Sequence, residues 1–103
     1  MPKKGTTGLK TQLLVNEMVI PLNDFTQQYI GNVLKGIAQS LGCSGKDVRF
    51  NLDRDGLNFY SEDKDIEIKT EFSRDIVEST VKGMLSPIRG IVWIEKVMIT
   101  TKG

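Results

Sequence analysis

The sequence predicts an α+β domain in which two helices lie on one face of a four-stranded antiparallel sheet. The first supporting observation is an internal repeat, because the segment that begins at Asp24 recurs without a gap at Glu71, an offset of 47 residues. The aligned pairs include Phe25 with Phe72, Lys35 with Lys82 and Gly36 with Gly83. The second observation is that each copy has helical periodicity and is flanked by segments that read as strands. The repeat therefore predicts two related halves arranged about a pseudo-two-fold axis.

Composition indicates a single cytoplasmic domain. The chain has 103 residues, a common size for one domain, and a net charge of +1. This balance is not typical of a dedicated nucleic-acid binder, and no apolar run is long enough to span a membrane. A single cysteine excludes an internal disulfide and fits a reducing compartment. The absence of histidine removes the commonest acid–base catalyst and zinc ligand.

The first strand leaves two alternatives open. Residues 1–9 are expected to form a disordered basic tail, followed by a single α+β domain over residues 10–101. Residues 12–22 are rich in apolar residues and predict a strand, which Asn16 and Glu17 interrupt. This segment is either one irregular strand, which we prefer, or two short strands around a tight turn. Pro21 cannot donate to a neighbouring strand, so the strand ends there or lies at an edge.

Two amphipathic helices follow from the repeat. The first is expected to begin at Asn23 or Asp24 and to stop at Gly42. The second is expected to begin at Thr70 or Ser73. The positions assigned to the core-facing sides of the helices are Phe25, Tyr29, Ile30, Val33, Leu34, Ile37, Leu41, Phe72, Ile76, Val77, Thr80, Val81, Met84 and Ile88.

The remaining strands complete the sheet. Residues 48–52 alternate apolar and polar side chains, and the turn at 53–56 predicts a hairpin with the strand that follows. Residues 57–69 are either one bulged strand or a second hairpin, and the sequence does not decide between them. Residues 91–99 predict a last strand that is apolar on both sides. The helices can cover only one side, so a partner subunit is expected on the other.

The resulting order is strand, helix, strand, strand, helix, strand. This is the ferredoxin-like or split βαβ pattern, with one helix in each half. Gly36 and Gly83 fall at the edge of the apolar face inside the two helices, where glycine costs about 0.5–1 kcal/mol relative to alanine. We therefore expect the two helices to approach closely at these glycines.

The open face of the sheet is the candidate partner or RNA surface. Four residues are expected to line it, namely Arg49, Phe59, Tyr60 and Trp93. The element order is shared with the RNA-recognition motif, whose strands stack bases on aromatic side chains. Residues 55–60 resemble the third-strand signature of that family in part, with Leu57 where an aromatic residue is expected. Binding of single-stranded RNA is therefore the second hypothesis.

Other chemistries find less support in the sequence. The topology is also that of acylphosphatases, whose phosphate loop carries an arginine, but residues 21–24 contain none. It is shared by regulatory domains of the ACT kind, so a small-ligand domain for amino acids or nucleotides is a third hypothesis.

Residues 53–56 begin like a calcium loop, but the EF-hand spacing fails at Leu57 and Asn58. Cys43 follows a helix C-terminus, where the helix dipole does not activate a thiol. We expect no catalytic residue, cofactor or metal.

A further run of residues resembles small prokaryotic proteins of unknown function. It comprises residues 20–25 with Asn32, Gly36, Ser40 and Leu41 downstream, and covers about a quarter of the chain. The resemblance implies no activity.

The leading hypothesis is a non-enzymatic, cytoplasmic binding module that self-associates through the open sheet face. A homodimer, or another protein partner, is expected on that face. Nucleic acid is possible there but less favoured, and no membrane partner is expected.

Overall fold

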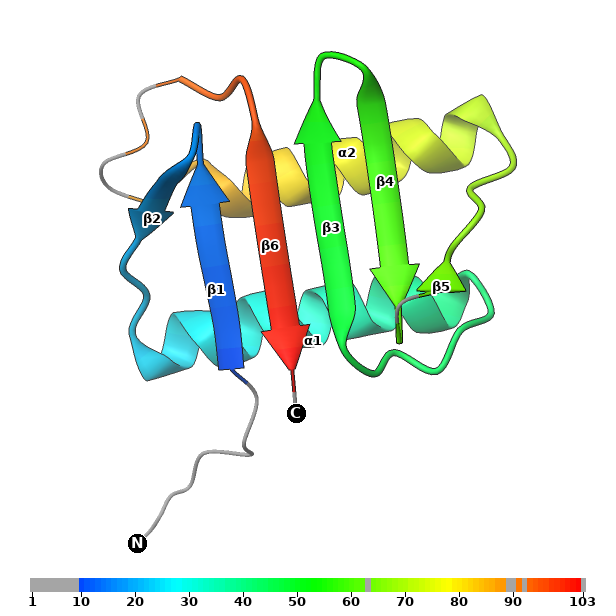
Figure 1. Ribbon diagram of the computed structural model, residues 1–103, viewed down its shortest axis with the longest axis horizontal. Helices are drawn as coiled ribbons and strands as arrows, with labels where there is room; N and C mark the ends of the chain where they lie inside the picture. Colours follow the sequence, from blue (N-terminus) through cyan, green and yellow to red (C-terminus); the bar gives the residue numbers. More distant parts are fainter. Residues whose placement is uncertain (1–9, 63, 89–90, 92, 103) are drawn as a thin grey trace, which may run out of the picture.

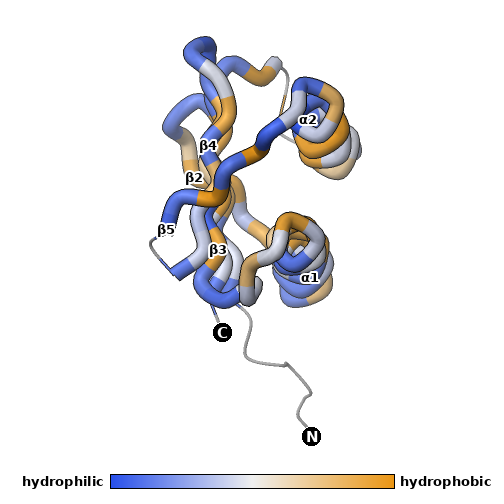
Figure 2. The backbone as a smooth tube through the Cα atoms, turned by 90° about the vertical axis from the view of Figure 1, so that its right-hand side faces the viewer, coloured by the Kyte–Doolittle hydropathy of each residue, from blue (hydrophilic) through white to orange (hydrophobic). Residues whose placement is uncertain are grey.

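The computed structural model describes residues 10–62, 64–88, 91 and 93–102. Its elements are β1 (Lys10–Val15), β2 (Met18–Ile20), α1 (Asp24–Ser40), β3 (Val48–Asp53), β4 (Gly56–Ser61), β5 (Lys64–Asp65), α2 (Glu71–Leu85) and β6 (Val97–Lys102). The six strands form one antiparallel sheet in the order β2-β1-β6-β3-β4-β5, and both helices lie on one face of it (Figures 1 and 2). The protein is therefore α+β, but the predicted four-stranded ferredoxin-like sheet is wrong.

The two additional strands come from hairpins at the edges of the sheet. Asn16 and Glu17 have φ angles of 52° and 70°, so a two-residue turn closes β2 onto β1. The preferred single strand over residues 12–22 is therefore wrong. In the other half, Glu62 has a φ of 54° where β4 turns into β5. Of the two alternatives for residues 57–69, the structure has the second hairpin, formed by β4 and β5, and a segment without regular structure follows it.

The two halves of the chain are built alike. Each half has the order ββαβ, as β1-β2-α1-β3 and as β4-β5-α2-β6. If β1, β2 and β3 are exchanged with β4, β5 and β6, the strand order of the sheet stays the same but is read from the opposite edge. The pseudo-two-fold axis therefore passes between the two central strands, β6 and β3. α1 begins at Asp24 and α2 at Glu71, which is the offset of the sequence repeat. The unit that repeats therefore contains one edge strand more than the sequence predicted.

The hydrophobic core lies between the sheet and the two helices. It is made by alternate strand residues, one stripe of each helix and two isoleucines of the segment after β5: Leu13, Val15, Ile20, Ile30, Leu34, Ala38, Val48, Phe50, Leu52, Phe59, Ile66, Ile68, Val77, Val81, Leu85, Val97 and Ile99. The rings of Phe50 and Phe59 lie opposite each other on β3 and β4 and meet edge to face, with centroids 5.8 Å apart. The far face of the sheet and the outer face of the helices remain exposed (Figure 2).

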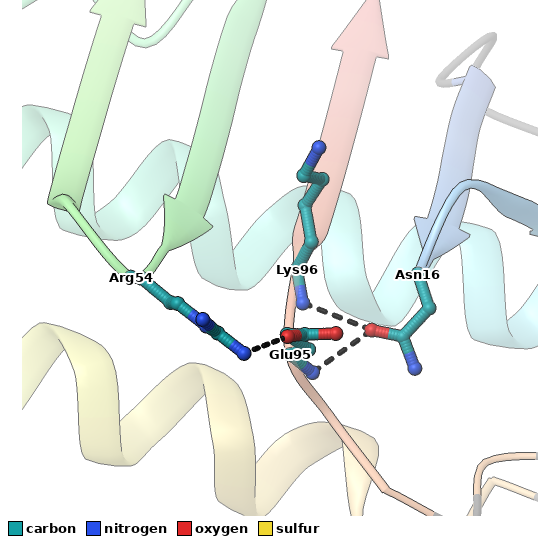
Figure 3. A network of polar contacts seen from close by, with 4 residues as sticks. All are labelled: Asn16, Arg54, Glu95 and Lys96. Atoms are coloured by element: carbon teal, nitrogen blue, oxygen red, sulfur yellow. Dashed lines mark hydrogen bonds and ion pairs between the residues drawn. The ribbon is translucent and has the colours of Figure 1, made fainter.

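The last strand begins later than predicted. Residues 91–96 were expected to belong to it, but residue 91 and residues 93–96 are not in a strand and β6 begins at Val97; residue 92 lies outside the described residues. The Asn16 side chain accepts hydrogen bonds from the backbone N–H groups of Glu95 (2.8 Å) and Lys96 (2.9 Å) (Figure 3). It also donates one to the Trp93 carbonyl (3.0 Å). Backbone groups that would otherwise need a neighbouring strand are thus satisfied by one side chain.

A buried pair of threonines connects β1, β6 and α1. The Thr11 hydroxyl donates to the Gln27 carbonyl (2.8 Å), which can only accept. The Thr11 hydroxyl therefore has no hydrogen left for Thr101, so Thr101 donates to it across 2.6 Å. The Gln27 side chain also accepts the backbone N–H of Thr11 (3.2 Å). These bonds fix α1 against the start of β1.

We expect the two threonines to differ when each is replaced by valine. Thr11→Val leaves the buried Thr101 hydroxyl without its acceptor, and should lower the free energy of unfolding by about 1–3 kcal/mol. Thr101→Val removes only the donor of that bond and leaves the Thr11 hydroxyl bonded to the Gln27 carbonyl, so it should cost about 0.5–1.5 kcal/mol. Urea denaturation of both variants measures the difference. A larger loss in Thr101→Val would contradict the assigned donor direction.

Candidate functional site

Two of the four residues predicted for the open sheet face lie on it. Arg49 and Tyr60 are opposite each other on β3 and β4, with the guanidinium carbon 5.0 Å from the ring centroid. Phe59 is instead fully buried in the core, because neighbouring residues of a strand point to opposite faces. Trp93 is exposed, but it lies in the segment before β6 and not in a strand. The predicted surface is therefore divided among three places.

The open sheet face is mainly polar, which removes the basis for the predicted dimer through it. Every second residue of β6 from Val97 is buried, and of its outward residues only Met98 is apolar. Leu14 and Val19 lie beside Met98 and complete a small apolar corner. The other outward positions include Lys10, Gln12, Arg49, Asn51, Asn58, Tyr60, Asp65, Thr100 and Lys102. The expectation that the last strand is apolar on both sides is wrong.

A cleft of about 470 Å³ opens at the end of the sheet beside Trp93. Its lining residues are Asn16, Glu17, Asp53, Arg54, Asp55, Trp93, Glu95 and Lys96. Arg54 pairs with Glu95 at 2.6 Å (Figure 3), and Lys96 pairs with Glu17 at 3.3 Å. Because the two cations of the cleft are paired with its own carboxylates, we interpret this cluster as a connection between three loops.

The outer face of the helices exposes large apolar side chains in both halves. Phe25 is 74% exposed and its repeat partner Phe72 is 72% exposed. The next aligned pair, Tyr29 and Ile76, is also exposed, and the rings of Phe25 and Tyr29 stack with centroids 5.9 Å apart. The assignment of these four residues to the core is wrong. They lie on the flank of each helix, beside the stripe that contacts the sheet.

Two apolar hollows lie between the helices, one at each end. One has a volume of about 390 Å³ and is formed by the start of α1 and the end of α2; the other, of about 500 Å³, is formed by the end of α1 and the start of α2. The repeat maps lining residues of the first onto lining residues of the second: Thr26 onto Ser73, Tyr29 onto Ile76, Ile30 onto Val77, Met84 onto Ile37, Pro87 onto Ser40 and Ile88 onto Leu41. We call the four exposed residues and the two hollows the helix-layer face.

Gly36 and Gly83 lie on the two helices, but the helices do not approach each other there. A Cβ atom added at either glycine would meet no atom within 4 Å. The predicted close contact at these glycines is therefore wrong. Neither glycine has a positive φ angle, so the fold does not require glycine at these two positions.

The remaining groups show no reactive arrangement within the described ranges. Cys43 is half-buried after the end of α1, and the chain has no histidine that could activate it. No group of three or more His, Cys, Asp or Glu side chains in the described part of the chain could hold a metal ion. Neither of the helices described is long and apolar enough to cross a membrane.

No protein-family model, curated protein or solved structure matches this chain. Among its surfaces, the helix-layer face combines exposed aromatic side chains with two hollows that the internal repeat relates to each other. The signal for this face was present in the sequence, because the repeat keeps both a phenylalanine and a glycine on the same flank of each helix.

Proposed function

We propose that the chain is a non-enzymatic, cytoplasmic interaction module that self-associates through the helix-layer face. The observation that carries this proposal is the pair of repeat-related hollows, each beside an exposed phenylalanine. Phe25 lines the first hollow, and Phe72 directly precedes Ser73, which lines the second.

A second copy of the chain is the occupant that fits this face. An isologous dimer needs one patch that complements itself, and here projecting rings and apolar hollows occur together on the same face. A phenylalanine of one copy can enter a hollow of the other while the reciprocal contact forms at the two-fold related site. Buried aromatic anchors of this kind supply most of the binding energy in protein interfaces.

The exposed glycines support the same occupant. Inside a helix, glycine costs about 0.5–1 kcal/mol relative to alanine, and nothing within the described chain offsets that cost at Gly36 or Gly83. Without a side chain at these points, the helices of a second copy can approach more closely than the usual 8–10 Å between helix axes would otherwise permit. The cost is then compensated in the dimer.

The dimensions of the molecule are adequate for a stable interface. The extents are 44 × 33 × 19 Å, and the broad side that carries the two helices has the two larger dimensions. A standard interface buries roughly 800 Å² on each partner, which is less than the area of this side. The small apolar corner around Met98 on the opposite side is far more limited.

The proposal is tested with a double variant, Phe25→Ser with Phe72→Ser. Both rings are exposed in one copy, so the variant should fold like the wild type while self-association weakens by about thirtyfold or more. Sedimentation equilibrium over micromolar concentrations measures the association, and circular dichroism confirms the fold.

The matched control removes two exposed apolar side chains elsewhere, by Trp93→Ser with Met98→Ser. This control should dimerise like the wild type. A wild-type chain that remains monomeric at high micromolar concentration would overturn the proposal. A dimer weakened by the control and not by the phenylalanine variant would place the interface on the sheet side instead.

A further inference from the structure

The polar part of the open sheet face concentrates positive charge. Lys10 and Lys102 lie directly opposite each other on β1 and β6, and both are exposed. Like charges at opposite positions of neighbouring strands are destabilising. Arg49 lines the adjoining hollow together with Lys102, and the carboxylate there belongs to Asp47. Two adjacent hollows of about 330 and 190 Å³ are thus lined by three cations and one anion.

A flat cation–aromatic pair adjoins these charges. The Arg49 guanidinium lies over the Tyr60 ring at 5.0 Å, and Thr100 separates this pair from Gln12 in one row across the sheet. The row crosses four strands over about 14 Å at the usual strand spacing, and Asp65 lies opposite Tyr60 on the next strand, β5. Arginine planes and tyrosine rings are the surfaces on which proteins stack unpaired bases.

Hydrogen-bonding groups occupy the next row. Asn51 and Asn58 lie opposite each other on β3 and β4. Within the described residues, the Asn51 Oδ1 atom is buried and accepts no hydrogen bond. That oxygen is closed to a ligand, whereas Asn58 is exposed, and its amide can pair with the edge of a base, which offers both donors and acceptors.

We propose that this part of the open sheet face binds single-stranded nucleic acid. Lys10 and Lys102 contact phosphates, the Arg49–Tyr60 pair stacks a base, and Asn58 hydrogen-bonds to a base edge. Charge complementarity favours this occupant over a protein, because Lys10, Lys102 and Arg49 lie close together on this polar face and outnumber the neighbouring Asp47 and Asp65. A single strand is favoured over a duplex, whose bases are not free to stack on side chains. This site lies on the opposite face from the helix-layer face and does not depend on the proposed dimer.

The test is titration of the full chain into fluorescently labelled, mixed-sequence oligonucleotides at low salt, read by anisotropy. Single-stranded RNA, single-stranded DNA and a duplex form the three arms. The double variant Lys10→Glu with Lys102→Glu should weaken binding of a single strand by about tenfold or more and reduce its salt dependence. Tyr60→Leu should weaken it by about five- to 150-fold through lost stacking.

The matched control, Lys35→Glu with Lys82→Glu, makes the same charge change on the helices and should weaken binding far less. Tighter binding of RNA, of DNA or of both than of the duplex supports the proposal and identifies the preferred sugar. Absence of binding at low salt overturns the proposal. So does a preference for the duplex, equal competition by polyphosphate, or equal weakening by the control.

Discussion

A Phe59→Ala variant is expected to lose about 3–5 kcal/mol of the free energy of unfolding. The ring is fully buried and packs edge to face against Phe50, so its removal leaves a cavity between the sheet and the helices. Domains of this size are commonly stable by about 5–15 kcal/mol, and the variant should therefore be close to unfolding. Urea denaturation followed by circular dichroism measures the loss.

The neighbouring residue provides the control for this prediction. Tyr60→Ala removes an aromatic ring of similar size, but from the open face of the same strand. We expect it to cost clearly less than Phe59→Ala, because the half-buried tyrosine fills no closed core and leaves no cavity. Equal losses at the two positions would contradict the assigned faces of β4, since they would indicate that both rings support the core.

These two residues also show what the sequence could establish and what it could not. Strand alternation implies that Phe59 and Tyr60 face opposite sides, so placing both on the open face was inconsistent with the predicted strand itself. The sequence did not show which of the two faced the core, because both are aromatic and common in half-buried strands. The answer depends on the register with β3, where Phe50 is opposite Phe59.

The helices were predictable and the edge hairpins were not. α1 and α2 begin one repeat apart, as the sequence indicated, because long periodic segments with capping residues are strong local signals. The hairpin turns at Asn16, Glu17 and Glu62 use positive φ angles without glycine, and β5 has two residues. Such turns lack the usual signal of a tight hairpin, and their formation depends on contacts made elsewhere in the fold.

The repeat was informative beyond the fold, although its meaning was misassigned. Phe25 and Phe72 were placed in the core because phenylalanine is usually buried. In the structure each helix contacts the sheet through a separate stripe, and the two rings remain outside. A dimer through the helix-layer face would cover these rings and leave the open sheet face of each copy outward, so both proposed activities can coexist.

An Asn16→Ala variant is expected to lose about 2.5–6.5 kcal/mol of the free energy of unfolding, although the side chain is only half-buried. Its three hydrogen bonds hold Trp93, Glu95 and Lys96 in place, and each contributes about 0.5–1.5 kcal/mol. Alanine must also adopt a φ near 52°, which costs it about 1–2 kcal/mol. Urea denaturation gives the total loss, and Trp93 fluorescence reports on the segment before β6.

Two further substitutions separate the side-chain bonds from the backbone strain. Asn16→Gly adopts the same φ freely but forms none of the three bonds, so it should be more stable than Asn16→Ala. Asn16→Asp keeps the acceptor for the backbone N–H groups of Glu95 and Lys96, and loses only the donor to Trp93. It should therefore lose the least. If the aspartate variant is as unstable as the alanine variant, the hydrogen bonds from the backbone N–H groups of Glu95 and Lys96 do not stabilise this end of the sheet. The late start of β6 would then need another cause.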